Sequence, residues 1–221
     1  MHDRRDAHSF RQGCRGVIDT AVAQLGGVDV LILNHIIGYY DDWAARVMRG
    51  HVEGTLEKDL SFVDQIFSIN TLSYIYLSSY ALPELAKASG KIIAVGSAAG
   101  KQGLPRVAPY AATKHAVFGY FDSLRHDLIA SPDPSLARVT VTTGVLGSFD
   151  TETAREGTGG KLDSLVVWSP PADAASALLK AGARRWRTVY VPWEQTRIIT
   201  LLHPLMPELM DWVIRRFMIP A

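Results

Sequence analysis

Two uninterrupted apolar runs, residues 30–33 and 92–95, stand out along the chain. Runs of this kind belong to parallel strands that are covered on both faces, whereas a half-exposed strand alternates apolar and polar positions. We therefore expect buried strands over residues 28–34 and at 92–95. Residues 138–143 alternate and are rich in β-branched side chains, and residues 188–191 predict a fourth strand.

Apolar residues at helical spacing predict helices between these strands. They cover residues 9–25, 61–89, 107–130 and 172–183. The segment 61–89 is apolar nearly all round, so it lies either deep in a core or against a partner. The mixed segment 35–59 predicts a loop.

Asn70 lies near the middle of the apolar helix 61–89. An amide that is buried without hydrogen-bond partners costs about 1–3 kcal/mol, so this position needs an explanation. Either backbone groups satisfy the side chain, or the side chain has a functional role. The pattern leaves both interpretations open.

Strands that alternate with helices predict an α/β fold with a parallel sheet and right-handed crossovers. At 221 residues the chain suits one domain. Residues 157–160 are glycine-rich and residues 164–171 partly apolar, which predicts either an ordinary loop or a lid.

The tail, residues 195–221, is apolar and aromatic, with Pro204 and Pro207 separating two short helices. Leu209, Val213 and Phe217 share a face of the second helix. This face either closes a core or subunit contact, or rests on a lipid surface.

Composition and charge exclude several function classes. The formal net charge is +1 and the pI is about 7.9, so there is no nucleic-acid footprint. Cys14 is the only cysteine, which rules out an internal disulfide. The histidines lack the spacing of metal ligands. The opening residues lack the apolar core of a secretory signal, and no run of ~20 apolar residues could span a membrane.

The candidate chemistry lies in residues 91–125, which predict a strand, a glycine-rich turn and a helix. Tyr110 and Lys114 are four residues apart, on one helical face with Val117, Phe121 and Leu128. An unpaired ammonium on a buried face is costly. Beside Tyr110 it would favour the phenolate and lower the phenol pKa from about 10. The alternative is a lysine that reaches solvent from the edge of the helix.

Ser97 follows the strand 92–95 at its carboxyl end. Open α/β sheets bind their ligands at this edge. The hydroxyls of Ser97 and Tyr110 and the amine of Lys114 would then converge on one site, where Tyr110 could exchange a proton.

Four motifs and their spacing carry a resemblance to a known family. The motifs are LILNHI at 31–36, Asn70 with LSY at 72–74, GSAAGK at 96–101 and YAATK at 110–114, extended by LGSFDTET at 146–153. Asn70 and Ser97 are 27 residues apart, and Ser97 and Tyr110 are 13 apart. With this spacing the chain resembles the short-chain dehydrogenase/reductase superfamily, and within it the 11β-hydroxysteroid dehydrogenase type 1-like enzymes.

The resemblance implies a catalytic role for four residues. Ser97 would hydrogen-bond the substrate oxygen, and Tyr110 would pass the proton while a hydride moves to or from a nicotinamide. Lys114 would bind the nicotinamide ribose and lower the pKa of Tyr110. Asn70 would order a water that relays protons to the lysine.

The resemblance also implies a cofactor site and a Rossmann-like doubly wound sheet. Tyr110 and Lys114 would hold the cofactor together with four further residues: Asn34, Leu146, Gly147 and Thr151. The cofactor would be NADP, by analogy with the subgroup, or NAD. The implied substrate is a steroid or another lipophilic carbonyl or alcohol.

One family feature is absent from these 221 residues. No glycine-rich phosphate-binding turn followed by a helix precedes residue 28, so the resemblance covers only the last two thirds of the family domain. The strand 28–34 should then be an exposed apolar edge. We expect either an incomplete stretch of a working oxidoreductase or a shortened isoform with poor cofactor affinity.

Three function classes follow, with the oxidoreductase favoured. The others are a catalytically silent relative that acts as a dimerising or regulatory partner, and a membrane-surface protein that uses the apolar tail. The family implies a homodimer through the helices 61–89 and 107–130. It also implies association with the endoplasmic reticulum membrane, the alternative being the cytoplasm.

Overall fold

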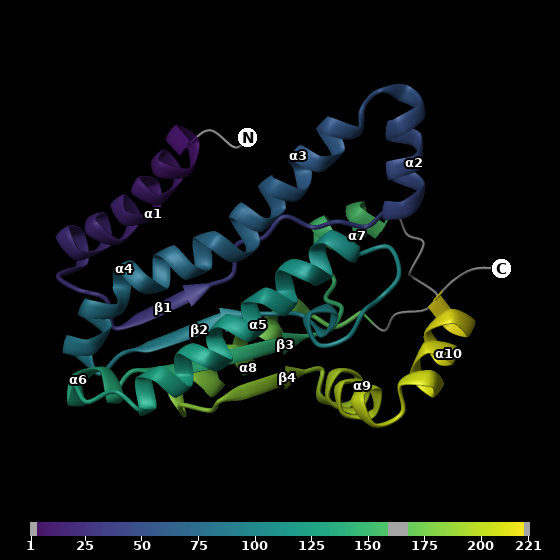
Figure 1. The fold of residues 1–221 in the computed structure, drawn as a ribbon. Coiled ribbons are helices and arrows are strands. Elements are labelled where there is room, and N and C mark those ends of the chain that lie inside the picture. The colour runs from purple at the N-terminus through teal and green to yellow at the C-terminus, as the bar shows by residue number, and fades with distance from the viewer. Residues whose placement is uncertain (1–3, 159–167, 219–221) are drawn as a thin grey trace.

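The computed structural model describes residues 4–158 and 168–218 (Figure 1). The strands are β1 (Val30–Leu33), β2 (Lys91–Val95), β3 (Thr140–Leu146) and β4 (Thr188–Val191). The α-helices are α1 (Arg4–Leu25), α2 (Trp43–Glu53), α3 (Leu56–Phe67), α4 (Ser73–Ala88), α5 (Ala108–Ile129), α6 (Pro134–Ala137), α7 (Glu152–Thr158), α8 (Pro171–Ala183), α9 (Trp193–Leu205) and α10 (Pro207–Met218). A π-helical turn, η1 (Ser68–Leu72), joins α3 to α4, and a 3₁₀ turn, η2 (Ala98–Gly100), follows β2.

The four strands form one parallel sheet in the order β1-β2-β3-β4. Leu31 pairs with Ile92, and Gly144 pairs with Val189. The predicted α/β fold is therefore confirmed. β3 continues to Leu146 instead of ending at residue 143, because its last residues pair along β4.

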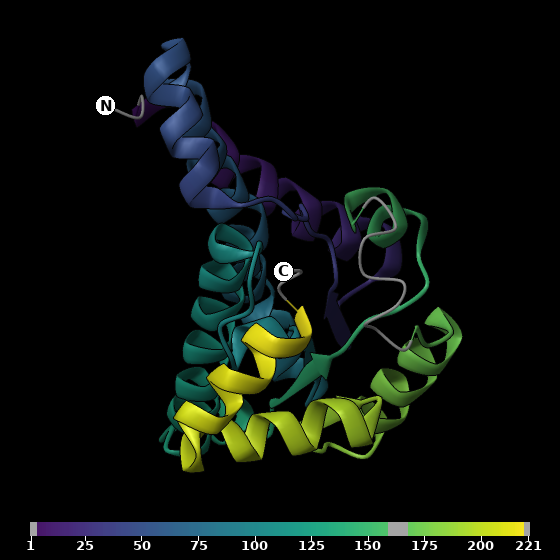
Figure 2. The same cartoon turned by 90° about the vertical axis from the view of Figure 1, so that its right-hand side faces the viewer.

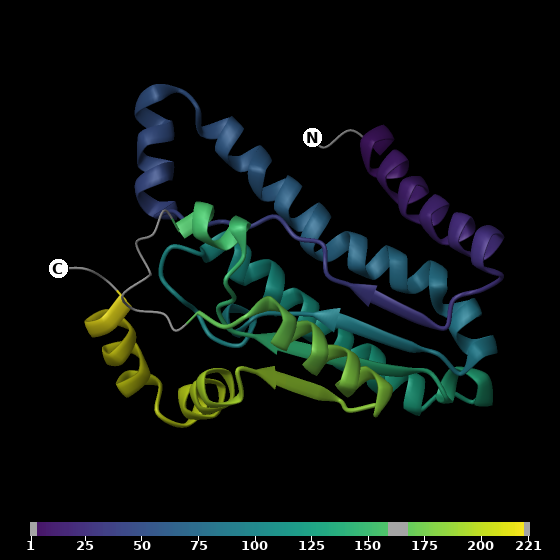
Figure 3. The same cartoon turned by 180° about the vertical axis from the view of Figure 1, so that it is seen from behind.

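Helices cover both faces of this sheet. α4 and α5 pack on one face with α1 outside α4, while α8 packs on the other (Figures 1 and 3). Val117, Phe121 and Leu128 of α5 are buried in the first core, which confirms the predicted inward face of this helix. Ile93 of β2 and Leu178 of α8 belong to the second core.

The segment 35–59 was expected to be a loop, and this prediction is wrong. It contains α2 and the first residues of α3, which project away from the sheet in Figure 2. The Asp42 side chain accepts a hydrogen bond from Ala45 N and begins α2, and Gly54 ends α2 with a left-handed φ of 71°. α2 and residues 56–60 of α3 carry polar residues on much of their surface, so the apolar pattern missed them, whereas the rest of α3 lies within the predicted helix 61–89.

The predicted single helix 61–89 is in fact three helical pieces. The chain runs from α3 through η1 into α4, so the backbone widens to a π-helical turn at Asn70. π turns are rare and often occur at functional sites. A π turn holds one more residue per turn than an α-helix. The apolar pattern does not reveal it, because all three pieces remain helical.

The outer strand β1 is an exposed apolar edge, as predicted, so the expectation from its apolar run that it is buried on both faces is wrong. Val30 and Ile32 are 43% and 47% exposed, whereas Leu33 on the opposite face is 1% exposed. β1 pairs only with β2 in the described part of the chain. Edges of this kind can pair with other chains.

The tail forms two helices, as predicted, with α9 against β4 and α10 against α9 (Figure 2). Pro204 lies inside the last turn of α9, and Met206 separates the two helices. On the predicted face of α10, Leu209 is exposed and Val213 is half-buried. The Phe217 side chain and most of the predicted lid, residues 159–167, lie outside the described residues.

Candidate active site

The parallel strands place several predicted site residues at one edge of the sheet. Asn34 follows β1, Ser97 follows β2 by two residues, and Leu146 and Gly147 end β3. Because all strands run the same way, these positions lie at the carboxyl edge where α/β folds bind ligands.

Ser97 is held by a tight turn between β2 and η2. Its Oγ accepts a hydrogen bond from Ala99 N at 3.2 Å and caps the 3₁₀ turn. A Cβ on Gly96 would lie 2.3 Å from the Phe118 ring and 2.8 Å from Gly144 O, so only glycine fits at this position. The turn directs Ser97 toward the N-terminal part of α5, where a side-chain hydrogen bond links it to Tyr110.

Tyr110 lies in the first turn of α5 and is 9% exposed. Burial raises the pKa of its phenol, the nearby Tyr40 raises it further, and the hydrogen bond from Ser97 acts in the opposite direction. The expectation that Lys114 lowers the pKa of this phenol is therefore wrong for the described structure. Tyr110 keeps its proton at neutral pH.

Lys114 is 1% exposed, so the prediction of a buried lysine is correct. Its Nζ donates to Val95 O at 2.9 Å and lies 5.3 Å from the centre of the Tyr74 ring. No carboxylate of the described residues forms an ion pair with it. Burial therefore lowers the pKa of Lys114 to about 7.

The distance between lysine and phenol explains the error in the expected pKa. Lys114 Nζ is 5.8 Å from the centre of the Tyr110 ring, and its hydrogen bond goes to Val95 O instead of the phenol oxygen. A half-neutral amine at this distance stabilises a phenolate much less than a fully charged one in contact would.

Asn70 is fully buried in the π turn and makes three hydrogen bonds. Its Oδ1 accepts from Ile37 N at 2.7 Å, and its Nδ2 donates to Ile37 O at 2.9 Å and to Thr113 Oγ1 at 3.3 Å. Of the two interpretations left open by the sequence, satisfaction by backbone groups describes this side chain. Asn70 thus ties the segment after β1 to α5, and its role in ordering a water stays a prediction.

Thr113 and Tyr74 are site residues that sequence reasoning did not single out. Thr113 Oγ1 donates to Tyr110 O at 2.7 Å, and Thr71 Oγ1 donates to Thr113 O at 3.2 Å, so the π turn is fastened to α5 beside the tyrosine. Tyr74 lies four residues after Asn70, and its hydroxyl donates to His35 O at 3.0 Å. The available signal was the helical spacing between Asn70 and Tyr74.

His35 lies close enough to Lys114 for the charge of the amine to affect it. Burial lowers the pKa of this imidazole, and Lys114 lowers it further. His35 Nε2 is 2.6 Å from Ser73 Oγ, which itself donates to Ile69 O. Because that hydroxyl proton is already used, Nε2 of His35 is the donor to Ser73.

The remaining predicted cofactor residues lie at the sheet edge with fewer contacts. Gly147 N donates to Val191 O at 2.8 Å, and Leu146 is half-buried. The Thr151 hydroxyl accepts from Ala154 N at 3.2 Å and so caps α7, and its side chain is exposed. Asn34 is also exposed. Their roles toward a cofactor stay predictions.

Among the described residues, no group of three or more His, Cys, Asp and Glu side chains could hold a metal ion. Within the same residues, the helices are too short or too polar to cross a bilayer.

The parallel sheet with helices on both faces makes this an α/β protein with a Rossmann-like fold. Comparison with known proteins assigns the chain to a family. The short chain dehydrogenase family profile matches residues 6–160, so the chain belongs to this family. The hydroxysteroid 11-beta-dehydrogenase 1-like protein of Xenopus tropicalis is 36% identical over 202 residues, which cover 90% of this chain and 63% of that protein. The protein of the same name from Gallus gallus is 38% identical over 178 residues, which cover 80% of this chain and 55% of that protein.

Solved structures agree on the fold. A short-chain dehydrogenase from Streptomyces avermitilis matches with a TM-score of 0.66 at 20% identity, over 91% of this chain and 75% of that chain. The Thermoplasma acidophilum aldohexose dehydrogenase matches with a TM-score of 0.64 at 19% identity, over 82% of this chain and 72% of that chain. The chain spans 63% of the length of the Xenopus tropicalis relative.

Proposed function

We propose that this protein is an oxidoreductase that transfers a hydride between a nicotinamide cofactor and a hydroxyl or ketone group of a lipophilic substrate. The observation that carries the proposal is the convergence of Ser97, Tyr110 and a buried Lys114 at the carboxyl edge of the sheet. The names of the relatives support a steroid as the substrate. The comparisons do not support the alternative of a catalytically silent partner.

The amine of Lys114 supports binding of the nicotinamide half of the cofactor. An ammonium has three N–H donors, and Val95 O accepts one of them within the described residues. A buried cation with unspent donors fits the hydroxyls of a ribose. Tyr110 and Lys114 would hold that sugar, and Leu146 and Gly147 would border the nicotinamide ring.

We infer NADP as the cofactor, with NAD as the alternative. A related fold, the alcohol dehydrogenase of Thermococcus sibiricus, is complexed with 5-hydroxy-NADP, at 17% identity to this chain. A bound nicotinamide supplies or accepts the hydride. The chain's own residues orient the substrate and move the proton.

In the direction of ketone reduction, Ser97 and Tyr110 would both donate hydrogen bonds to the carbonyl oxygen. The raised pKa of Tyr110 keeps its phenol protonated, so the phenol can give its proton to that oxygen as negative charge develops. The phenolate left behind would lie near Lys114, whose Nζ is 5.8 Å from the centre of the Tyr110 ring. His35 lies near the amine, whose charge lowers the pKa of the imidazole.

We also propose a homodimer through α4 and α5, together with peripheral membrane contact through the tail. The contact with lipid is supported by exposed apolar side chains on α9 and α10: Trp193 is 58% exposed, Leu205 75% and Trp212 58%. We propose a location at the endoplasmic reticulum membrane by analogy with the resembling subgroup, with the cytoplasm as the alternative. Liposome flotation with and without residues 204–221 tests the membrane contact.

Replacement of Tyr110 by Phe tests the proposed function. Tyr110→Phe removes one hydroxyl from a buried ring, so we expect a folded protein whose turnover at saturating cofactor falls by about 100- to 10,000-fold. Tyr76→Phe is the matched control, because Tyr76 packs against Phe10 at a distance from the site. An unchanged rate for Tyr110→Phe would contradict the assignment.

A further inference from the structure

A cavity of about 650 Å³ has a lining that includes neither Ser97 nor Tyr110. Its walls come from α5, from the turn before β4, from β4 itself and from α9. Basic side chains supply much of the lining: Lys101, Arg125, His126, Arg187 and Arg197. None of these residues has a part in the proposed hydride transfer.

The positive charge in this cavity is only partly neutralised. Asp122 is the carboxylate in its lining, and it pairs with both Lys101 at 3.3 Å and Arg125 at 2.8 Å. Arg187 and Arg197 form no ion pair with any carboxylate of the described residues. Four cations therefore face one carboxylate, although the whole chain has a net charge of only +1.

The two unpaired arginines are attached to a rigid part of the molecule. The Arg197 guanidinium stacks on the Tyr190 ring at 4.7 Å and is half-buried. The Arg187 carbonyl accepts hydrogen bonds from Arg125 and Thr143, which fixes its backbone at the start of β4. A ligand would therefore meet one guanidinium, that of Arg197, which needs little further ordering, and a second, that of Arg187, which extends from a fixed backbone.

We propose that this cavity binds the phosphate group of a small organic phosphate. Planar guanidinium groups bind phosphate oxygens in a bidentate manner. Trp186 and Tyr190 add aromatic surface to the same lining, which suits an apolar body attached to the phosphate. The proposal does not rest on the proposed oxidoreductase function.

The test is isothermal titration calorimetry of the full chain with inorganic phosphate and with phenyl phosphate. We expect both to bind, phenyl phosphate more tightly, and affinity to fall as salt is raised. The double variant Arg187→Gln/Arg197→Gln should weaken binding by about tenfold or more. Circular dichroism and thermal unfolding establish that the variant is folded, and the single variant Arg187→Gln replaces it if it is not.

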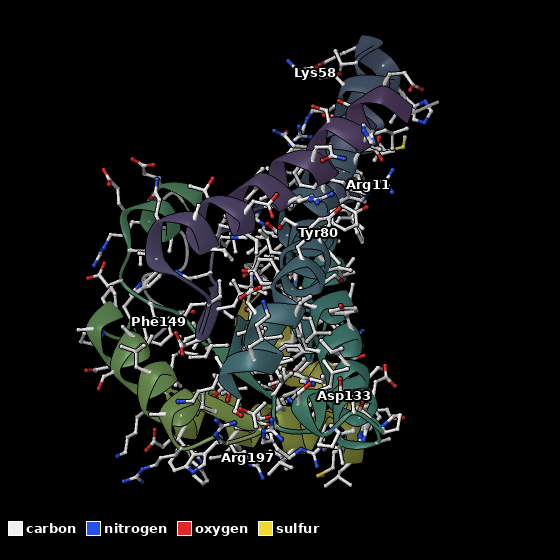
Figure 4. All side chains as sticks on the ribbon, turned by 90° about the vertical axis from the view of Figure 1, so that its left-hand side faces the viewer. Arg11, Lys58, Tyr80, Asp133, Phe149 and Arg197 are labelled. Carbon is white, nitrogen blue, oxygen red and sulfur yellow. The ribbon has the colours of Figure 1, made fainter. Side chains whose placement is uncertain are left out.

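Two controls locate the phosphate. Arg11→Gln removes one positive charge from α1, at the other end of the molecule from Arg197 (Figure 4), and should leave affinity unchanged. Lys114→Met alters the proposed active site and should also leave it unchanged. The proposal is overturned if neither phosphate binds, if the double variant binds as tightly as the original chain, or if either control loses as much affinity.

Vesicles identify the source of the phosphate. Flotation with phosphatidylcholine vesicles, with and without phosphatidic acid, asks whether a lipid headgroup is the ligand, because Ile198 and Leu201 beside Arg197 are 46% and 50% exposed. Binding that needs phosphatidic acid and both arginines supports a lipid phosphate. Binding of phenyl phosphate without vesicle binding supports a soluble phosphate ester.

Discussion

At the scale of single residues, a lysine without a carboxylate partner is the most unusual feature of the site. Burial of a lysine side chain favours the neutral amine over the ammonium, and this lowers the pKa of Lys114 to about 7. Such a group stabilises the folded chain poorly, so its presence at this position requires another explanation. Binding of a ribose provides that explanation in the proposed reaction.

The stability of the protein should therefore depend on pH through Lys114. Between about pH 7 and its ordinary pKa near 10.4, the amine is protonated in the unfolded chain but neutral in the folded one. The unfolded state binds more protons in this window, so the free energy of unfolding should rise with pH across it and level off below pH 7.

Lys114→Met should remove this dependence and stabilise the protein. Methionine fills a similar volume without a charge, so we expect about 1–4 kcal/mol of added stability at neutral pH and less at pH 10, together with loss of activity. Urea denaturation at a series of pH values measures the free energy of unfolding of both chains. Lys58→Met, at an exposed position on α3 (Figure 4), should leave the pH profile unchanged. Equal profiles for Lys114→Met and the original chain would contradict the account.

At the scale of elements, the site depends on how closely β2, the turn after it and α5 approach one another. A Cβ at Gly96 would overlap the Phe118 ring and the Gly144 carbonyl. A Cβ at Gly100 would lie 2.7 Å from the backbone of Lys114. Glycine at these two positions allows Ser97 to reach Tyr110.

Gly96→Ala should therefore separate these elements. We expect a loss of about 1–3 kcal/mol from overpacking, and a fall in turnover because Ser97 moves away from Tyr110. Gly16→Ala on α1 is the matched control, since nothing lies within 4 Å of its added methyl group, and should raise stability by about 0.5–1 kcal/mol. Thermal unfolding of both variants decides: the prediction fails if Gly96→Ala is as stable as the original chain.

Periodicity and turn chemistry predicted the elements that pack against the sheet. The strand at 188–191 and the inward face of α5 have the predicted limits and burial, since burial on the sheet dictates their pattern. α2 and residues 56–60 of α3 were missed, and they project from the sheet instead of packing on it, whereas residues 61–67 of α3 lie within the predicted helix 61–89. The π turn at Asn70 and the pKa of Tyr110 depend on contacts between distant segments, which a single sequence does not reveal.

At the scale of the whole molecule, the sheet has one covered end and one open end. α9 packs against β4, whereas the outward residues Val30 and Ile32 of β1 remain nearly half exposed. An apolar strand edge of this kind can pair with another chain. In a chain of these 221 residues, the open end therefore offers a route to self-association that is separate from the proposed dimer through α4 and α5.

Ile32→Lys should reduce that self-association. A charge on the exposed face of an edge strand opposes pairing with another copy. Sedimentation velocity over a range of protein concentrations should show fewer large species than the original chain forms. Val52→Lys places the same charge on α2, where Val52 is 86% exposed, and should change the distribution little. An equal effect of both substitutions would rule out a specific role of the edge.

The central claim is that Ser97, Tyr110 and Lys114 form the proton-transfer site of a nicotinamide-dependent oxidoreductase. Transfer of deuterium from a reduced cofactor labelled at the nicotinamide C4 to a steroid ketone, read by mass spectrometry at millimolar cofactor, tests it most directly. The account predicts deuterium on the new carbinol carbon with the original chain and none above background with Tyr110→Phe. Absence of label with the original chain, or equal labelling by both, would contradict it.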